Sequence, residues 1–214
     1  MSTLDLRDLR REYAKAGLHE DELDPNPFVQ FQQWYQDIDR PETLDANAMI
    51  VATVDSLGQP RQRTVLLKEV EDNGFIFFSN YESAKGQDIA SNPQVSILFA
   101  WHVLERQVII QGQAERVENA VSESYFSSRP VGSQIAAAIS QQSAMVENRD
   151  VLEASYQELE QKLDGSMPER PEHWGGYRVL PQQFEFWQGR SNRLHDRLIY
   201  TRQSGGWAVG RLQP

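Results

Sequence analysis

Short apolar runs separated by tight turns constrain the fold of this chain most strongly. Ala48 to Asp55 is a β-branched, apolar run, and the turn at 56–59 separates it from a second predicted strand at Arg61 to Glu69. Asp72-Asn73-Gly74 is a further turn, and it leads into a third strand at Gly74 to Ser79. Strands of this length joined by tight turns are typical of an antiparallel barrel. We therefore expect mainly β structure from Ala48 onward.

Further strands lie on both sides of a helical insert. They are expected at Gln94 to His102, Glu105 to Val117, Gly176 to Leu180, Gln183 to Gln188, Arg193 to Arg202 and Gly206 to Leu212. Helical patterns cover Glu82 to Ser91, Asn119 to Ser127, Ser133 to Ser140 and Glu147 to Leu163. Because strands flank the insert at about 118–164, the C-terminal strands should complete the same sheet. This predicts a single domain over residues 41–214.

The first 40 residues are expected to form a peripheral helical segment that is partly mobile. Leu4 to Ala16 is charged, with apolar residues at helical spacing. After the interruption at Asp24-Pro25-Asn26-Pro27, Phe28, Phe31 and Trp34 mark an amphipathic helix.

Composition excludes several classes of function. The 214 residues include no cysteine, which removes disulfides, thiolate metal sites and thiol catalysis. A formal net charge of −10 argues against a nucleic-acid binder and leaves small anions as ligands for local basic clusters. The four histidines lack metal-ligand spacing, so no metal site is expected. With neither a signal peptide nor an apolar run of spanning length, we expect a soluble, cytoplasmic protein.

The stretch from Phe186 to Arg197 gathers cations within this acidic chain. Arg190, Arg193 and Arg197 fall within eight residues. Because alternate residues of a strand share a face, Arg193, His195 and Arg197 are expected to project together. Clustered like charges cost free energy, so the cluster suggests an anionic or electron-rich small ligand.

Two alternatives to a ligand site stay open for this stretch. In the first, the arginines are surface charges paired with Asp196 and Glu185. In the second, Trp187 is a core residue rather than a ligand contact. Spacing alone does not separate these alternatives from a binding site.

Arg63 and Lys68 bracket the second predicted strand. Their separation is odd, so strict alternation places them on opposite faces. They could serve one ligand only at the strand end or across a bulge. The alternative is an edge strand with solvated ends.

A strand-to-helix junction lies between Ser79 and Gly86. Free N–H groups at the helix start, with a hydroxyl and Lys85 nearby, could bind an anion. Ordinary capping by Ser83 explains the same pattern equally well.

A break between two predicted helices follows Tyr125. Arg129 and Ser133 straddle the Arg-Pro break and could hold a phosphate between them. Ser133 is expected to cap the second helix, which accounts for the serine but not for Arg129. The polar loop from Ser140 to Ser143 is a weaker indication of a site.

In this order, these motifs resemble the pyridoxamine 5′-phosphate oxidases (pyridoxine 5′-phosphate oxidases). The resemblance covers nearly the whole chain, from the segment at 9–13 to the terminal Arg211-Leu-Gln-Pro214. Its most specific stretches are Arg63 to Lys68, Leu104 to Val108, Tyr125 to Pro130, Trp174-Gly-Gly176, Glu185 to Gly189 and Arg193 to Arg197.

The resemblance implies a mainly β fold with peripheral helices, a split β-barrel of the FMN-binding type. It also implies a homodimer with FMN at the subunit interface, each FMN contacted by both chains. The implied FMN contacts are Arg63, Lys68, Phe78, Ser79, Lys85, Gln107, Gln142, Ser143, Trp187 and Arg197. The implied substrate contacts are Lys68, Tyr125, Arg129 and Ser133 at the phosphate, with Arg193 and His195 over the ring as catalytic residues. Arg10 to Tyr13 matches a segment that can fold over the active site in the family.

The implied activity belongs to vitamin B6 biosynthesis and salvage. The C4′ carbon of pyridoxine or pyridoxamine 5′-phosphate would be oxidised to the aldehyde, pyridoxal 5′-phosphate, with O₂ as acceptor and H₂O₂ as product. The alternatives are a flavin reductase-like enzyme on the same barrel and a non-catalytic flavin- or pyridoxal-phosphate-binding protein.

One departure from the family pattern concerns the flavin phosphate. The family usually reads Ser-Arg-Lys where this chain has Ser83-Ala84-Lys85, and the arginine is a flavin-phosphate contact. A charge-assisted hydrogen bond contributes about 1.5–3 kcal/mol, so FMN affinity is expected to be about tenfold to a hundredfold lower unless something replaces it. Ser79, in place of the commoner threonine, keeps the hydroxyl.

Overall fold

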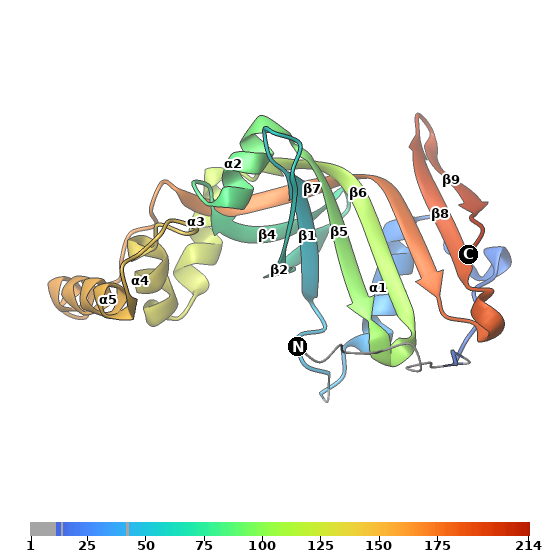
Figure 1. Cartoon of the computed structure of the whole chain (residues 1–214), viewed down its shortest axis with the longest axis horizontal. Helices are drawn as coiled ribbons and strands as arrows, with labels where there is room; N and C mark the ends of the chain where they lie inside the picture. Colours follow the sequence, from blue (N-terminus) through green and yellow to red (C-terminus); the bar gives the residue numbers. More distant parts are fainter. Residues whose placement is uncertain (1–11, 14, 42) are drawn as a thin grey trace, which may run out of the picture. The chain divides into compact units, whose positions relative to one another are not determined.

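The computed structural model describes residues 12–13, 15–41 and 43–214. Along the described chain, α1 precedes four successive strands, and three successive helices separate β6 from the C-terminal strands (Figure 1). The strands are β1 (Ala48–Val54), β2 (Pro60–Leu66), β3 (Glu69–Glu71), β4 (Gly74–Asn80), β5 (Gln94–Trp101), β6 (Arg106–Arg116), β7 (Trp174–Gln188), β8 (Asp196–Gln203) and β9 (Gly206–Arg211). The helices are α1 (Pro27–Ile38), α2 (Ala84–Ser91), α3 (Asn119–Ser128), α4 (Val131–Ile139) and α5 (Arg149–Leu163), with 3₁₀ turns η1 (Glu20–Glu22), η2 (His102–Leu104) and η3 (Ser191–Arg193).

The sheet has the strand order β2-β1-β5-β6-β7-β4-β3, and β8 pairs with both β7 and β9. The predicted mainly β fold with helices is confirmed. No helix in the described part of the chain is both long enough and apolar enough to cross a membrane.

The chain divides into two compact units. Unit 1 holds the described residues up to Ala46 together with Leu98–Ile110 and Gln182–Pro214, and unit 2 holds Asn47–Ile97 and Gln111–Pro181. The predicted single domain over 41–214, with its insert at about 118–164, stays a prediction.

Helix α1 and the aromatic residues of β7 build the core of unit 1. Asn26 caps α1 by accepting a hydrogen bond from the amide of Phe28, and Pro27 occupies the first turn, where its missing N–H costs nothing. The Phe28 ring packs edge-on against Phe184 with centroids 5.2 Å apart, and Trp34 packs against Phe186 at 5.1 Å. The aromatic periodicity predicted this helix correctly.

Unit 2 contains the β1–β2 hairpin and the three consecutive helices α3, α4 and α5. Residues of β1 alternate between buried and half-buried, as expected for a strand with one covered face. Asn148 caps α5 by accepting from the amide of Val151, and α5 packs against α4 (Figure 1).

The predicted strand from Arg61 to Glu69 is interrupted. Strand β2 ends at Leu66, and β3 begins at Glu69. Between them the amide of Leu67 donates to the Asn47 carbonyl, whereas the amide of Lys68 donates to the Ile76 carbonyl. The chain thus leaves its β1 partner and joins β4 within two residues, so the alternation argument for Arg63 and Lys68 does not apply.

Two strands predicted around Pro181 are one strand. Strand β7 runs from Trp174 to Gln188 through Leu180 and Pro181. A Cβ added at Gly112 would lie 2.1 Å from the Leu180 carbonyl oxygen, so the absence of a side chain on β6 lets β7 pass closely at this point.

The predicted strand from Arg193 to Arg202 begins late, at Asp196. Asn192 and Arg193 both have positive φ, +56° and +62°, which a strand does not accept. Arg193 therefore ends a 3₁₀ turn, and the prediction that Arg193, His195 and Arg197 alternate along one strand face is wrong.

Two further predictions concern helix starts. Residues 4–11 and 14 of the helix predicted over Leu4 to Ala16 lie outside the described residues, and the remaining described positions of that range are not helical. Ser133 does not cap α4, because α4 begins at Val131 and Pro130 is its N-cap.

Candidate functional site

Lys85 is a buried cation without a carboxylate partner among the described residues. It lies in the first turn of α2 and is 8% exposed. Its Nζ donates to Ser79 Oγ at 2.9 Å, to Ser83 Oγ at 3.2 Å and to Gln142 Oε1 at 2.5 Å, all neutral acceptors. Burial, together with the nearby Arg63 guanidinium, lowers the pKa of Lys85 to about 8. An anion placed here would compensate the desolvated charge.

The start of α2 combines capping with a second polar contact. Ser83 Oγ accepts from the Gly86 amide at 3.3 Å, so the capping alternative is confirmed. The Ala84 amide donates to Ser143 Oγ at 3.2 Å. Gln142 and Ser143 therefore lie beside the start of α2, although they are distant from it in the sequence.

Arg63 is held by neutral oxygens and shares a buried carboxylate. Its Nη1 donates to Thr53 Oγ1 at 2.7 Å and to the Val51 carbonyl at 3.1 Å. Asp88, 3% exposed, lies 3.8 Å from Arg63 Nη2 and 3.0 Å from Arg61 Nη1. Sequence reasoning missed Asp88, because a single aspartate inside a helix carries no signal of its partners.

Arg129 stands apart from every carboxylate in the described chain. Its guanidinium carbon lies 4.7 Å from the centre of the Trp174 ring, and its Nη1 is buried without a hydrogen-bond partner. Burial lowers the pKa of Arg129. Tyr125 stacks on Phe78 with ring centroids 3.9 Å apart. Sequence reasoning gave Trp174 no role, although the Trp-Gly-Gly motif was a signal.

Two other predicted residues of unit 2 stay without described side-chain contacts. Lys68 is exposed beyond the end of β2. Ser133 lies in the first turn of α4, where its amide donates to the Pro130 carbonyl. Nothing in the described contacts joins either residue to Arg129.

A pocket of about 650 Å³ opens beside the start of α2. Ala84, Gln142 and Ser143 are part of its lining. Ala84 contributes only a methyl group to this wall, so the pocket has room for a longer side chain.

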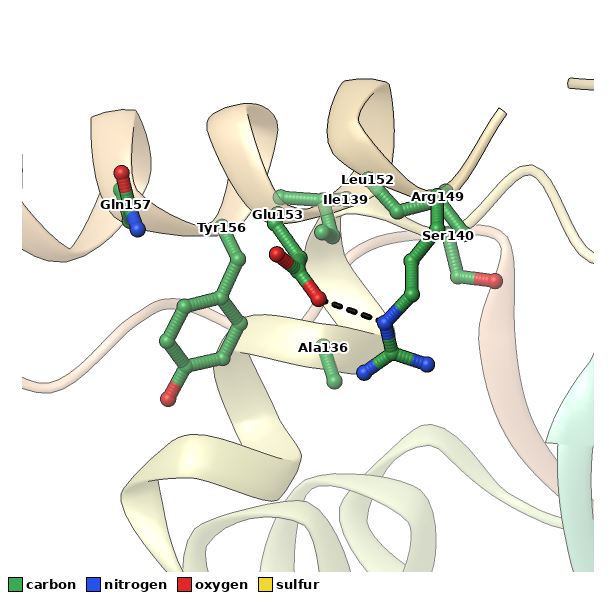
Figure 2. Close-up of a pocket in the computed structure, with 8 residues that line it drawn as sticks. All are labelled: Ala136, Ile139, Ser140, Arg149, Leu152, Glu153, Tyr156 and Gln157. Carbon is green, nitrogen blue, oxygen red and sulfur yellow. Dashed lines mark hydrogen bonds and ion pairs between the residues drawn. The ribbon is translucent and has the colours of Figure 1, made fainter. Parts of the chain in front are cut away.

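A second pocket, of about 430 Å³, lies between α4 and α5 (Figure 2). Its lining contains Arg149 and Glu153, which point toward one another and form a hydrogen-bonded ion pair at 2.5 Å. No predicted site residue lines it, and its cation is already neutralised, so it does not offer an anion site.

In unit 1 the predicted residues gather around an aromatic cluster. The Trp187 and His195 rings lie 4.7 Å apart, and Tyr13 packs edge-on against both at 5.8 Å. The Arg190 amide donates to His195 Nδ1 at 3.1 Å. Arg193 is the last residue of the 3₁₀ turn η3, two residues before His195, and its side chain is exposed to solvent.

The alternative that the C-terminal arginines pair with Asp196 and Glu185 is confirmed for Arg190 and Arg197. Arg197 Nε donates to Glu185 at 2.7 Å, which raises the pKa of the guanidinium, and its Nη1 donates to the Gln213 carbonyl at 2.9 Å. Arg190 lies 3.5 Å from Asp196. Trp187 is half-buried rather than part of the core, and Gln107 is half-buried on β6.

Two family models together match most of the chain. One, described as pyridoxamine 5′-phosphate oxidase, matches residues 40–163, and the other, the pyridoxine 5′-phosphate oxidase C-terminal dimerisation region, matches residues 174–214. This chain belongs to the pyridoxamine 5′-phosphate oxidase family. The resemblance inferred from the motifs is thereby confirmed.

Curated relatives that match nearly the whole chain are named pyridoxine/pyridoxamine 5′-phosphate oxidase. The chain is 50% identical over 210 residues to pyridoxine/pyridoxamine 5′-phosphate oxidase 1 of Ralstonia nicotianae, covering 98% of this chain and 99% of that protein. It is 49% identical over 212 residues to the oxidase of Burkholderia thailandensis, covering 98% and 99%.

Two solved structures share the fold of this chain. PhzG from Burkholderia lata 383, in complex with tetrahydrophenazine-1-carboxylic acid, superposes with a TM-score of 0.88 at 29% identity, covering 94% of this chain and 99% of that one. A pyridoxamine 5′-phosphate oxidase-related, FMN-binding protein from Nostoc punctiforme gives 0.71 at 15% identity, covering 90% and 100%, and this likeness shows the fold alone. The predicted split-barrel fold of the oxidase family is confirmed.

Proposed function

We propose that this protein is an FMN-dependent oxidase that converts pyridoxine 5′-phosphate and pyridoxamine 5′-phosphate to pyridoxal 5′-phosphate. O₂ would be the electron acceptor and H₂O₂ a product, and with the amine substrate water would hydrolyse the resulting imine and release ammonia. Family membership and relatives at about 50% identity support the proposal. The observation that carries it is Arg129, an arginine with a buried, unpartnered nitrogen that suits a phosphate ester.

The cluster around Lys85 fits a flavin phosphate. Lys85 keeps its charge uncompensated, and Ser79, Gln142 and Ser143 supply hydroxyl and amide groups around it. Arg63 adds a second cation, held by Thr53. When bound, FMN would accept a hydride from C4′ of the substrate and pass two electrons to O₂. The remaining proposed FMN contacts are Lys68, Phe78, Gln107, Trp187 and Arg197.

The substrate phosphate would be held by Arg129 with Lys68, Tyr125 and Ser133. Arg129 would bind the phosphate more strongly than an arginine already paired with a carboxylate. Its guanidinium is desolvated, and no ion pair with a described residue has to break before the phosphate binds. Anchoring one end of the substrate places its ring in a defined orientation.

Arg193 and His195 are the proposed catalytic residues. Nδ1 of His195 accepts a hydrogen bond from the Arg190 amide. A neutral imidazole in this arrangement therefore carries its proton on Nε2. That N–H would donate a hydrogen bond to the substituent on C4′ and orient it. Arg193, exposed on the 3₁₀ turn, would orient the substrate ring and stabilise developing charge.

We further propose that two copies of the chain form a homodimer and that FMN binds at their interface. The match of residues 174–214 to the family's C-terminal dimerisation region supports this assembly. Sedimentation of the purified protein with and without FMN would test it, and a monomer at micromolar concentration in both states would contradict it.

The decisive experiment follows pyridoxal 5′-phosphate and H₂O₂ formation under air from pyridoxamine 5′-phosphate, with unphosphorylated pyridoxamine as the control. We expect stoichiometric aldehyde and peroxide from the phosphorylated substrate. The PhzG likeness makes a tetrahydrophenazine carboxylate a useful third substrate. Oxidation of that compound alone, flavin reduction by a nicotinamide without peroxide, or flavin binding without turnover would each favour a different function and refute ours.

A further inference from the structure

The Trp174-Gly175-Gly176 motif has no part in the functions assigned above, yet it lies directly beneath Arg129. Trp174 is the first residue of β7 and is 7% exposed. Its ring centre lies 4.7 Å from the guanidinium carbon of Arg129, within the range of a cation–π contact. The indole is therefore a candidate for holding the cation in place.

Arg129 has few other means of support. The next ring, Phe126, is 5.9 Å from the guanidinium carbon. Gln134 Nε2 donates to the Arg129 carbonyl at 2.8 Å, which fixes the backbone but not the side chain. Because Nη1 is buried without a partner, the side chain is oriented by ring faces and packing rather than by hydrogen bonds to a carboxylate. Support of this kind leaves the positive charge free for an anion.

The Trp174 ring is itself held by an aromatic stack. Phe78 lies parallel to Trp174 within 14°, with centroids 5.6 Å apart, and Tyr125 lies within 8° at 6.2 Å. Phe78 on β4 pairs with Gly176 on β7, and a Cβ at Gly176 would lie 2.9 Å from the Phe78 ring. The second glycine of the motif thus leaves space for the ring that orders Trp174.

We propose that Trp174 is a positioning residue that holds the Arg129 guanidinium for a phosphate monoester without neutralising its charge. The identity of that monoester as a vitamin B6 phosphate rests on the proposed function. The role of Trp174 does not, because it requires only that Arg129 bind a phosphate group.

The test measures binding and turnover separately. Calorimetry with 4-deoxypyridoxine 5′-phosphate, which has no oxidisable C4′ substituent, reports phosphate binding, and 4-deoxypyridoxine is its phosphate-free control. Steady-state assays with pyridoxamine 5′-phosphate give KM and kcat. The variants are Trp174→Leu, Trp174→Phe, Arg129→Ala and the double variant Trp174→Leu/Arg129→Ala.

Trp174→Leu should weaken binding of the phosphorylated analogue about tenfold and raise KM by a similar factor, with kcat changed less than about twofold. Trp174→Phe should recover most of the affinity, because it keeps a ring face. In the double variant the loss should equal that of Arg129→Ala alone, since the two residues act as one unit. Binding of the phosphate-free analogue should not change in any variant.

A matched control addresses loss of packing. Trp34 is 4% exposed and lies 4.4 Å beneath Arg106, so Trp34→Leu removes an equally buried indole from under an arginine outside this cluster. It should lower thermal stability without the selective loss of phosphate affinity. Additive losses in the double variant, or a folded Trp174→Leu protein with unchanged affinity, would overturn the proposal. Should wild type bind the phosphorylated analogue but oxidise nothing, the proposed function fails while the Trp174 inference is still tested.

Discussion

The main-chain amide of Arg190 donates a hydrogen bond to Nδ1 of His195 over 3.1 Å. This bond closes the turn that carries Arg193, and it leaves Nε2 as the nitrogen that faces other partners. The geometry separates the two nitrogens into a structural one and a reactive one.

Replacing His195 by asparagine should therefore keep the turn but remove the hydrogen bond that Nε2 would donate to the substrate. Asn Oδ1 can accept from the Arg190 amide as Nδ1 does, whereas nothing replaces Nε2. We expect kcat to fall about 10²-fold with FMN occupancy unchanged, the loss typical of one positioned hydrogen-bond donor. Stopped-flow flavin reduction by pyridoxamine 5′-phosphate measures the step directly, and a loss of FMN equal to the loss of rate would instead make His195 a cofactor ligand.

Lys85 should make the flavin-free protein more stable as pH rises from about 8 toward 10.5. Burial lowers the pKa of Lys85 from 10.5 to about 8, so between these values the unfolded chain binds a proton that the folded chain does not, and unfolding becomes less favourable. Below pH 8 the folded state carries the desolvated ammonium in full. Lys85→Met should stabilise the flavin-free protein there by about 1–3 kcal/mol, with an advantage that shrinks toward pH 10.

Urea unfolding at several pH values checks this stability prediction. The control is Lys162→Met, because Lys162 is exposed and paired with Glu158 on α5. Its substitution should leave the pH profile unchanged. A profile for Lys85→Met parallel to that of wild type would contradict the assignment.

FMN affinity should fall above pH 8 for the same reason. The free site loses the Lys85 proton near pH 8, so each further pH unit should weaken FMN binding by up to about tenfold until the pKa of the complex is reached. Quenching of flavin fluorescence between pH 7 and 9.5 measures the dissociation constant. Lys85→Met should bind FMN more weakly and show no break near pH 8.

Ala84→Arg should tighten FMN binding by about tenfold or more. The pocket beside Ala84 has room for the side chain, and the start of α2 would carry one more cation. Gln87→Arg is the matched control, because Gln87 lines the same pocket about one turn further along α2. Equal gains in both variants would indicate general electrostatic attraction rather than a phosphate contact.

Gly112→Ala should destabilise the protein by more than about 3 kcal/mol. The added Cβ would lie 2.1 Å from the Leu180 carbonyl oxygen, and a backbone atom cannot move aside alone. Gly205→Ala, where nothing lies within 4 Å of an added Cβ, provides the comparison. Similar unfolding midpoints for the two variants would show that β7 tolerates displacement at Pro181.

Local patterns predicted most elements, because each carries its own signal in neighbouring residues. The aromatic spacing of 28, 31 and 34 identified α1, and the β-branched, apolar run from Ala48 identified β1. Strand β7 was predicted as two strands, because Pro181 is a strand breaker in isolation and the accommodating Gly112 is far away in sequence.

The candidate site shows the same limit. The motifs marked Lys85 and the loop from Ser140 to Ser143 as separate features, and only the structure brings Gln142 and Ser143 to Lys85 and the start of α2. The prediction from alternation that Arg193 shares a strand face with His195 and Arg197 was wrong. Two residues with positive φ precede the strand, which begins only at Asp196. Asp88 and Trp174 act through residues distant in the sequence, so no local pattern could give them partners.

The neutral hydrogen-bond acceptors around the Lys85 ammonium have a consequence for the lifetime of the protein in the cell. An ammonium buried among hydroxyl and amide groups destabilises the folded state until an anion binds beside it. Cofactor binding should therefore also increase the resistance of the protein to unfolding. Chains made when flavin is scarce would open more often and be degraded sooner. With FMN as the proposed cofactor, riboflavin supply would thus affect how much of this protein accumulates.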